Sequence, residues 1–495
     1  MCIRDRSKTP FLNLTTQKIK QWSQHHSFPI DISEKWTDFV EQQWPLHLQE
    51  VSKRNYHNFK HIAQLRIILQ RFIIQCEDHA PTKLCVYCPK AYLDLHNKTM
   101  TDPTIFKVHK DTPTNVQATI LNNFPQELKR RYKWGIKADA PLPRCYIFPK
   151  RKKNFTTARP VITFYKTQCS TLYRALGKLI HDLTRKVYPH AFHGKTTTQT
   201  FKKLHKFIHD NIHQLQDINW NNDDIKGFFT SIEHPVIISS FYHMIQTYVD
   251  MHPDTPASEI TFSIDYRLPA KTPRTIQGKT IKSKTTVRIW LADIIPLVKL
   301  SLSTSVFVSI DKVHSQCRGS CIGNPASPPI SEVPIAFKEF MWLNSYKINH
   351  ADSVFLTRYV DNRLLAIPKS FFRQTKWRIL TELLFYGFPV ELEKEPAMDF
   401  LGFRIDTVQG TVTYIQPSQP WQFRSIRSAG TIQSLLAGLN SRIHLIGRHT
   451  YPKAMINKST QELLQIYQSV GYNYDDLLRS TSKVRKLYKI DVSPV

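Results

Sequence analysis

The sequence predicts an α+β fold that combines β-hairpins with helices. Two segments have the alternation and turns of β-hairpins. In the first, residues 144–150 and 158–164 are strand candidates joined by a basic turn. In the second, residues 354–367 place a short polar turn between two apolar runs. Apolar residues recur at helical spacing in three further segments, residues 172–187, 198–215 and 430–495.

Other segments extend this pattern over the rest of the chain. Residues 12–80 carry helix-like spacing, and residues 84–87 have the composition of a buried strand. Short helical pieces are expected at residues 92–95 and 118–121. Residues 262–288 are polar and basic with a turn at 277–279, so we interpret them as a hairpin inserted between two core elements.

The composition indicates a folded protein with a polyanionic partner. The chain has 495 residues, of which 41% are hydrophobic and 12% aromatic, which excludes a disordered tail. The 68 Lys+Arg residues outnumber the 39 Asp+Glu residues, giving a formal charge of +29 that is spread along the whole chain. Such an excess favours binding to nucleic acid. Because no amphipathic basic helix is evident, we expect no membrane partner.

The cysteines indicate a reducing compartment. Eight are scattered through the chain, as in proteins that keep free thiols. Cys85 and Cys88 have the spacing of zinc ligands, but no second pair completes a site, and the segment around them has the pattern of a strand. The charges of residues 1–8 are followed by no apolar run, so we expect no signal peptide.

Two aspartates are candidates for metal-dependent chemistry. Asp224 follows the apolar residues Ile218 and Trp220, which can form a strand that ends at the carboxylate. Asp361 lies in the polar turn of the 354–367 hairpin. Phosphoryl transfer by two metal ions requires carboxylates brought together from separate segments in this way. Each aspartate also has an ordinary structural interpretation, a helix N-cap for Asp224 and a hairpin turn for Asp361.

Two further segments suit a nucleotide. Gly319 and Gly323 precede Ser327 and Pro328, where a helix can begin, and the glycines permit close approach of a phosphate or base pair. The hairpin at residues 144–164 carries cations suited to a triphosphate at Lys150 and Arg159. Its basic string, residues 149–153, is similar to a nuclear-import signal and equally to a solvated turn.

In order and spacing, these segments resemble the motifs of reverse transcriptases. Asp224 with Phe229 resembles motif A, residues 319–328 motif B, residues 359–362 the YxDD sequence of motif C, and residues 400–403 motif E. Lys150 and residues 158–160 resemble the fingers motifs. Residues 316–328, Arg358 to Asp361, and residues 391–393 before 400–402 are most similar to the Penelope-like retroelement enzymes.

The resemblance implies a right-hand polymerase with fingers, a palm whose antiparallel sheet is flanked by helices, and a helical thumb. It implies a helical N-terminal extension over 1–115, fingers over 116–215, a palm over 216–410 with the basic insertion at about 262–288, and a thumb over 411–495. Its implied roles are catalysis and metal binding by Asp224 and Asp361, further metal contacts by Ile225 and Asn362, nucleotide binding by Lys150, Arg159, Phe229 and Gly323, a primer grip of Phe400, Leu401, Gly402 and Phe403, and general-acid catalysis by Lys394.

The implied activity is RNA-directed DNA synthesis with two Mg²⁺ ions, or Mn²⁺ as the alternative ion. The implied partners are an RNA template, a DNA primer, their hybrid and dNTPs, and the implied location is intracellular and nuclear. The oligomeric state is not predicted. The phenyl ring of Phe229 would stand at the sugar gate and favour deoxynucleotides. No GIY-YIG endonuclease is expected before Val495.

Asn362 departs from the family pattern, which has a second aspartate at this position. Its amide keeps an oxygen but loses a charge, so metal binding should be weaker. Activity would then be reduced, shifted towards Mn²⁺ or absent. Two alternatives therefore stay open: a reverse-transcriptase-derived RNA-binding scaffold without catalysis, and an RNA-dependent RNA polymerase.

Overall fold

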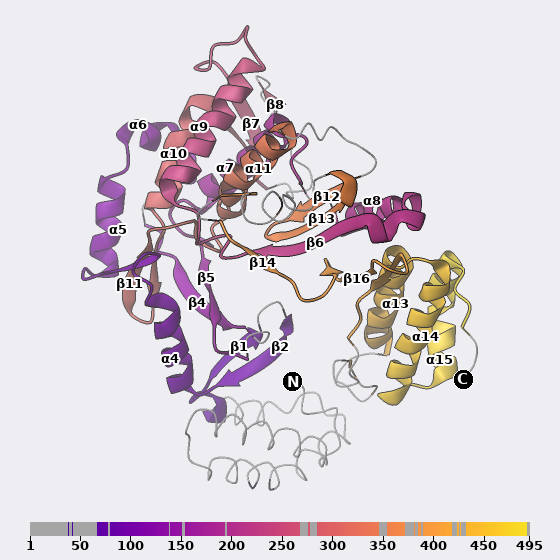
Figure 1. The fold of residues 1–495 in the computed structure, drawn as a ribbon. Coiled ribbons are helices and arrows are strands. Elements are labelled where there is room, and N and C mark those ends of the chain that lie inside the picture. The colour runs from indigo at the N-terminus through magenta and orange to yellow at the C-terminus, as the bar shows by residue number, and fades with distance from the viewer. Residues whose placement is uncertain are drawn as a thin grey trace. The chain divides into compact units, whose positions relative to one another are not determined.

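A computed structural model describes most of the chain beyond residue 66 (Figure 1). The described residues are 38, 42, 67–77, 80–137, 139–150, 154–193, 196–267, 276–277, 285–345, 354–371, 381, 385–387, 390–417, 423–424, 426 and 432–492. They divide into two compact units. The larger contains Gln75–Thr82 and Cys88–Leu401, and the smaller contains Lys83–Tyr87 with the described residues of 67–74 and 402–492.

The expected α+β class is confirmed, and a four-stranded antiparallel sheet in the larger unit brings the candidate aspartates together. Its strand order is β12 (Phe355–Tyr359), β13 (Asn362–Pro368), β6 (Ile218–Ile225) and β14 (Leu392–Lys394). The middle of β13 is apolar and buried, since Leu364 to Ile367 are all at 0% exposure. The predicted hairpin at 354–367 is therefore confirmed as β12 and β13.

A five-stranded sheet in the same unit contains the second predicted hairpin. Its order is β3 (Phe106–His109), β11 (Lys312–Gln316), β10 (Val306–Ser309), β4 (Arg144–Pro149) and β5 (Ala158–Thr163). All neighbours are antiparallel except β10 and β4. The β4–β5 pairing confirms that hairpin, whereas its basic turn at 151–153 lies outside the described residues.

The expected insertion hairpin at 262–288 is wrong in detail. β7 (Thr261–Asp265) pairs with both β8 (Ile276–Gln277) and β9 (Thr286–Trp290), giving a three-stranded sheet. Gln277, which was expected in a turn, lies in β8 and opposes Phe262. The fully buried Phe262 and Ile289 explain the pairing, because they join these strands to the main core.

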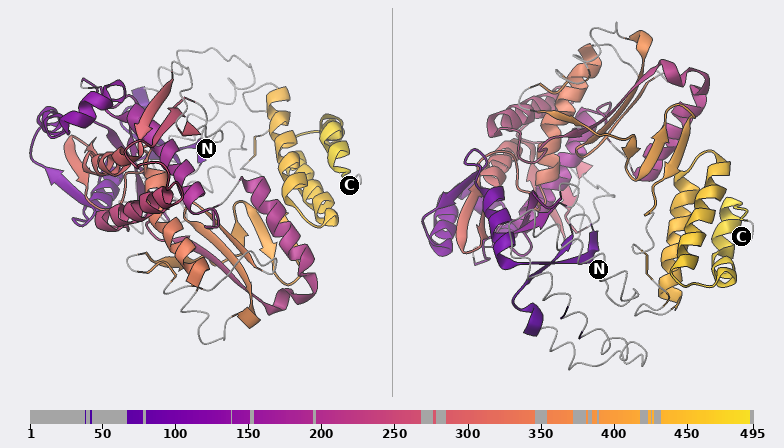
Figure 2. Two further views of the ribbon diagram at one scale, coloured as in Figure 1. Left: turned by 90° about the horizontal axis from the view of Figure 1, so that it is seen from above. Right: turned by 60° about the horizontal axis from the view of Figure 1, so that its bottom comes forward.

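Helices cover these sheets and supply most of the core of the larger unit. α11 (Ser327–Ser345) packs against α7 (Ser170–Val187) and α9 (His234–Asp250), and α10 (Ile294–Ser303) packs against α9 (Figures 1 and 2). The expected helices at 92–95, 118–121, 172–187 and 198–215 are confirmed, the last as a helix followed by a 3₁₀ turn. Among the described residues, the larger unit also contains α4 (Pro89–Met100), α5 (Pro113–Asn122), α6 (Gln126–Arg131) and α8 (Thr197–Asp210).

Only part of the helical expectation for residues 12–80 can be compared with the structure. Most of that segment lies outside the described residues. Helical residues end at Leu69, and β1 (Ile73–Glu77) and β2 (Ala80–Tyr87) are strands, so the expectation is wrong there. Isoleucine, valine and tyrosine in these strands explain the difference, since such residues favour extended backbone.

The smaller unit ends in three helices. β16 (Phe403–Asp406) pairs antiparallel with β17 (Thr411–Tyr414), and α13 (Ile432–His449), α14 (Lys453–Ser469) and α15 (Tyr474–Tyr488) follow. Their shared core includes the fully buried Leu439 and Leu463. The expected helices in 430–495 are therefore confirmed, while the division into extension, fingers, palm and thumb stays a prediction.

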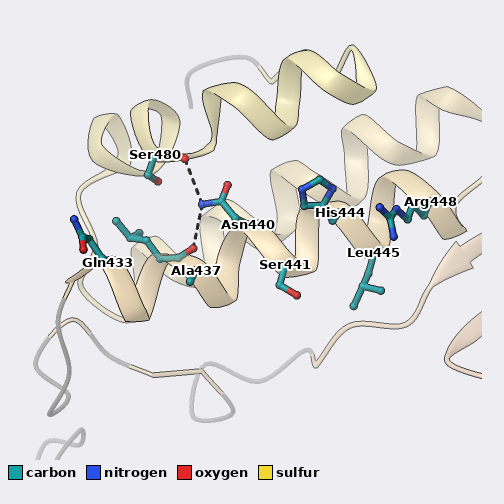
Figure 3. A pocket seen from close by; sticks show the side chains of 9 residues that line it. Gln433, Ala437, Asn440, Ser441, His444, Leu445, Arg448 and Ser480 are labelled. Atoms are coloured by element: carbon teal, nitrogen blue, oxygen red, sulfur yellow. Dashed lines mark hydrogen bonds between the residues drawn. The ribbon is translucent and has the colours of Figure 1, made fainter. Parts of the chain in front are cut away.

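An open groove of about 740 Å³ runs along α13 (Figure 3). Asn440 lines the groove and links α13 to α15. Its Nδ2 donates to the carbonyl oxygens of Leu436 at 3.2 Å and Ser480 at 3.3 Å. His444 and Arg448 also line this groove, which belongs to the smaller unit. The two candidate aspartates belong to the larger one.

Across the described ranges, no helix is long and apolar enough to cross a membrane.

Candidate active site

The sheet register places Asp224 and Asp361 next to each other. Asp224 in β6 directly opposes Asn362, the first residue of β13. The Ile225 N–H donates to the Asp361 carbonyl oxygen at 2.8 Å. Asp224 therefore lies next to the last residue of a strand, close to the expected strand end, and does not cap a helix. Turns separate it from α9, which begins at His234. The two aspartates come from separate segments of the chain, as two-metal chemistry requires.

The turn that carries Asp361 is strained. β12 and β13 are joined by Val360 and Asp361 alone, and Val360 has a φ of 58°. A positive φ in the first position of a two-residue hairpin loop is normally met by glycine. For a β-branched residue it costs on the order of 1–3 kcal/mol and persists only where surrounding contacts impose it. Tyr359 and Val360 are exposed at 44% and 38%, so the strained turn faces solvent.

Negative charge is concentrated at Asp224. Burial raises the pKa of this carboxyl to about 6, with further contributions from Asp361, Glu395 and Glu393 that outweigh the opposing effect of Lys150. Its Oδ1 atom is buried and has no hydrogen-bond partner. A buried carboxylate oxygen without a donor is costly in a site that offers no cation. A bound cation would lower that cost, so the Asp224 carboxylate stays a candidate metal ligand.

The donor atoms of the site suit a hard cation. The Asp224 and Asp361 carboxylates and the Ile225 carbonyl would offer Mg²⁺ the oxygen atoms that it prefers. Within the described ranges, no three His, Cys, Asp or Glu side chains are arranged to hold a metal ion. Mg²⁺ in nucleotidyl-transfer sites takes one or two carboxylates and completes its shell with water and substrate phosphates. The pair of aspartates fits that requirement.

Asn362 modifies the site through its amide. Its Nδ2 donates to Asp361 Oδ1 at 3.1 Å. Because Asn362 opposes Asp224 across the strands, its side chain shares the Asp224 face of the sheet. The amide therefore lies beside both aspartates and satisfies one lone pair of Asp361.

The register of β14 argues against Lys394 as a general acid. Glu393 opposes Asp224, and Lys394 opposes Asp223. Opposed residues share a face and successive residues alternate, so Lys394 lies on the face opposite to Asp224. Sequence reasoning missed Glu393 and Glu395 as site residues. The alternation of glutamates at 391, 393 and 395 was the available signal.

A buried arginine, Arg363, pairs with Asp223, the residue before Asp224. Arg363, at 0% exposure, donates to Asp223 Oδ2 from Nε at 3.2 Å and from Nη2 at 2.6 Å. Nη2 also donates to the Thr381 carbonyl oxygen at 2.7 Å, and the guanidinium lies 4.6 Å from the Phe385 ring centroid. This ion pair joins β6 to β13 at the residue pair next to Asp224 and Asn362. Sequence reasoning did not find it.

The glycine loop packs against backbone. A Cβ built on Gly319 would lie 2.1 Å from the Phe229 carbonyl oxygen, and one on Gly323 would lie 2.1 Å from the Ile162 carbonyl oxygen. The Ile162 N–H donates to the Ile322 carbonyl oxygen at 2.7 Å. These contacts give Gly323 a role in joining the loop to β5. The expected start of a helix at Ser327 is confirmed as α11.

The candidate nucleotide ligands lie in the same unit. Lys150 follows β4 and acts to lower the pKa of Asp224, so its ammonium lies within electrostatic reach of that carboxylate. Arg159 lies in β5, opposite Phe148. Phe229 is half-buried, and its ring meets that of Phe228 edge-on at 5.0 Å. Their contacts with a nucleotide stay predictions.

The candidate primer grip falls at the division between the two units. In the larger unit, Phe400 is buried at the end of β15 (Asp399–Phe400), and Leu401 has a φ of 50°. In the smaller unit, Gly402 has a φ of 85°, and Phe403 is buried at the start of β16. The role of these four residues in binding a primer stays a prediction.

Cys85 and Cys88 are free thiols, the first half-buried in β2 and the second exposed before α4.

Comparison with solved structures identifies the fold. The chain is similar to telomerase from Candida albicans in complex with the TWJ fragment of telomeric RNA, at 12% identity and a TM-score of 0.51, covering 87% of this chain and 66% of that one. It is similar to apo telomerase from Candida tropicalis, at 12% identity and a TM-score of 0.51, covering 94% and 73%. A Candida tropicalis telomerase with the same kind of RNA fragment gives 11%, 0.50, 86% and 63%.

The chain therefore has the fold of these telomerase chains and spans about two thirds of their length. No protein-family model and no curated protein matches it.

Proposed function

We propose that the chain is an RNA-directed DNA polymerase that extends a primer 3′-hydroxyl with dNTPs by metal-dependent phosphoryl transfer. The observation that carries this proposal is the juxtaposition of Asp224 and Asp361 on neighbouring strands, with Asp224 Oδ1 buried and without a donor. The fold similarity to telomerase supports a polymerase of the reverse-transcriptase type. The sequence resemblance to Penelope-like enzymes supports a retroelement origin and a nuclear location.

In this proposal the carboxylates of Asp224 and Asp361, with the Ile225 carbonyl, bind two Mg²⁺ ions. Bound there, the ions would activate the primer hydroxyl and stabilise the leaving pyrophosphate. Lys150 and Arg159 neutralise the triphosphate, which the influence of Lys150 on Asp224 supports. A bound cation would stabilise the ionised form of Asp224, which burial and the neighbouring carboxylates disfavour.

The proposed selectivity depends on Phe229. Its ring stands five residues after Asp224, where a bulky group excludes a 2′-hydroxyl, so dNTPs are favoured over NTPs. This residue favours a reverse transcriptase over an RNA-dependent RNA polymerase. An RNA template and a DNA primer are the proposed partners, and the charge of +29 supports binding of their phosphates.

A second candidate function is an RNA-binding scaffold without catalysis. The hydrogen bond from Asn362 Nδ2 to Asp361 Oδ1 favours it, because an amide replaces a carboxylate and satisfies part of the remaining aspartate. The unpaired Asp224 oxygen argues against it, since a scaffold gains nothing from burying a carboxylate without a donor.

Primer extension separates these candidates. A DNA primer annealed to an RNA template is incubated with dNTPs or NTPs, in Mg²⁺ and separately in Mn²⁺. Extension with dNTPs supports the reverse transcriptase, and extension with NTPs supports the RNA polymerase. RNA binding without extension in either metal would favour the scaffold.

A further inference from the structure

We infer that Glu339 and Arg358 form a buried positioning pair that orients the turn carrying Asp361. The inference rests on the proposed function, in which Asp361 binds the metal ions. Neither residue touches the reacting atoms. Both act through the Val360 carbonyl, as the contacts below show.

Glu339 is a fully buried carboxylate whose two oxygens accept four hydrogen bonds. It lies on α11 at 0% exposure. Oε1 accepts from Arg358 Nε at 2.5 Å and from the Tyr386 hydroxyl at 2.9 Å. Oε2 accepts from Arg358 Nη2 at 3.2 Å and from the Phe192 N–H at 3.0 Å. The side chain is thus fixed in one orientation from three segments.

Arg358 transmits this orientation to the turn. Its Nη1 donates to the Val360 carbonyl oxygen at 2.9 Å, within the strained turn. Its backbone N–H donates to the Phe192 carbonyl oxygen at 2.6 Å, so β12 is also tied to the segment that Glu339 holds. Burial and the charge of Glu339 act in opposite directions on this guanidinium, and Glu339 keeps the pKa of Arg358 above its ordinary value.

A second carboxylate completes the network. Glu332, also on α11, lies 4.0 Å from Arg358 Nη2 and 3.0 Å from His193 Nδ1. Burial opposes its ionisation, but His193 and Arg358 more than compensate and lower the pKa of Glu332 to about 2. Glu332 therefore stays ionised at neutral pH, and Glu332 and Glu339 both contact Arg358 from the same helix.

The Glu339–Arg358 pair contributes more to the orientation of the turn that carries Asp361 than to the stability of the fold. Desolvation makes a buried ion pair a poor source of net stability compared with apolar packing. The Val360 conformation, by contrast, is costly and needs a contact that imposes it. The carbonyl of Val360 precedes Asp361, so its direction sets where the Asp361 carboxylate points. Because α11 begins at Ser327, just after the glycine loop, one helix supports both the loop and the turn.

The test compares three variants of the full chain. Glu339→Gln removes one charge, and Glu339→Gln/Arg358→Met removes both, so the second variant avoids an unpaired buried guanidinium. Asp293→Asn is the matched control. Asp293 is 7% exposed and accepts from Arg131 Nη1 at 2.6 Å and from the Tyr132 hydroxyl at 2.6 Å, and it is not among the site residues.

Amide exchange gives the primary readout, because it needs neither metal nor activity. The Ile225 N–H, which donates to the Asp361 carbonyl, reports the position of the turn. We expect exchange at Ile225 to become roughly tenfold faster in both Glu339 variants and to stay unchanged in the control. Mn²⁺ binding that depends on Asp361, followed by electron paramagnetic resonance, should weaken about tenfold.

The outcomes separate this inference from the proposed function. Faster exchange and weaker Mn²⁺ binding in the double variant uphold the positioning role even if wild-type protein extends no primer. Ile225 protection and Mn²⁺ affinity equal to wild type in the folded double variant would overturn it. Equal changes in the Asp293→Asn control would also overturn it, since the effect would then be general destabilisation.

Discussion

Replacement of Gly323 by alanine should destabilise the larger unit far more than the same change at Gly387. Both glycines have positive φ, 107° and 69°. A new Cβ at Gly387 would have only Lys338 Nζ nearby, at 3.9 Å, whereas one at Gly323 would lie 2.1 Å from the Ile162 carbonyl oxygen. The first is the end of a flexible side chain, and the second is backbone.

The difference in cost follows from these contacts. Backbone strain alone costs about 1–2 kcal/mol and applies to both variants. At Gly323 the loop must also move away from β5 and break the Ile162 N–H to Ile322 hydrogen bond, which adds about 1–3 kcal/mol for the buried groups. We therefore expect Gly323→Ala to lower the free energy of unfolding by about 2–5 kcal/mol and Gly387→Ala by about 1–2 kcal/mol.

Urea unfolding measures this difference, provided amide exchange assigns the transition to the larger unit, since the two units can unfold separately. Equal destabilisation of the two variants would refute the reasoning. Gly323 would then be required for some reason other than its contact with β5.

Three further predictions concern titration and metal binding. The pKa of Asp224 is raised from 3.8 to about 6, so its ionisation costs stability as pH rises through that interval. Asp224→Asn should match wild type at pH 3 and be more stable by about 1 kcal/mol above pH 6, after allowance for solvent screening, in urea unfolding. Burial lowers the pKa of His314 from 6.5 to about 4. Wild-type stability should fall as pH drops through that interval, and His314→Phe should remove that part of the loss, as acid titration of the unfolding midpoint would show. Asn362→Asp should lower the Mn²⁺ dissociation constant by about 10-fold, because it adds a carboxylate on the Asp224 face; unchanged binding in calorimetry would contradict this.

Local patterns were sufficient to predict the elements that carry the site. The alternation around Asp361 and the apolar residues before Asp224 predicted both segments. The resemblance implied that both belong to one antiparallel sheet, and the structure shows which strands pair. The helices at α7 and in 430–495 followed from apolar periodicity. Each of these features depends on residues close together in the chain.

The supporting contacts depend on distant residues and could not be predicted in this way. Glu339 is one acidic residue in an apolar helix, and only the fold brings it to Arg358. The five-stranded sheet likewise pairs β3 with β11 across about two hundred residues, a pairing that no local pattern specifies. Lys394 was assigned by resemblance alone. In the structure Glu393 opposes Asp224, so Lys394, the next residue, lies on the other face of the sheet.

The most direct test of the proposed active site is the extension of a DNA primer on an RNA template by wild-type protein, Asp224→Asn and Asp361→Asn, with RNA affinity measured for each. We predict that wild-type protein incorporates dNTPs in Mg²⁺ or Mn²⁺. Both variants should lose at least about 10²-fold in rate while RNA affinity stays within about twofold, because the carboxylates bind metal and the basic surface binds RNA. Extension that survives both substitutions would contradict the assignment of these aspartates, and RNA binding without extension by wild-type protein would contradict the proposed enzyme.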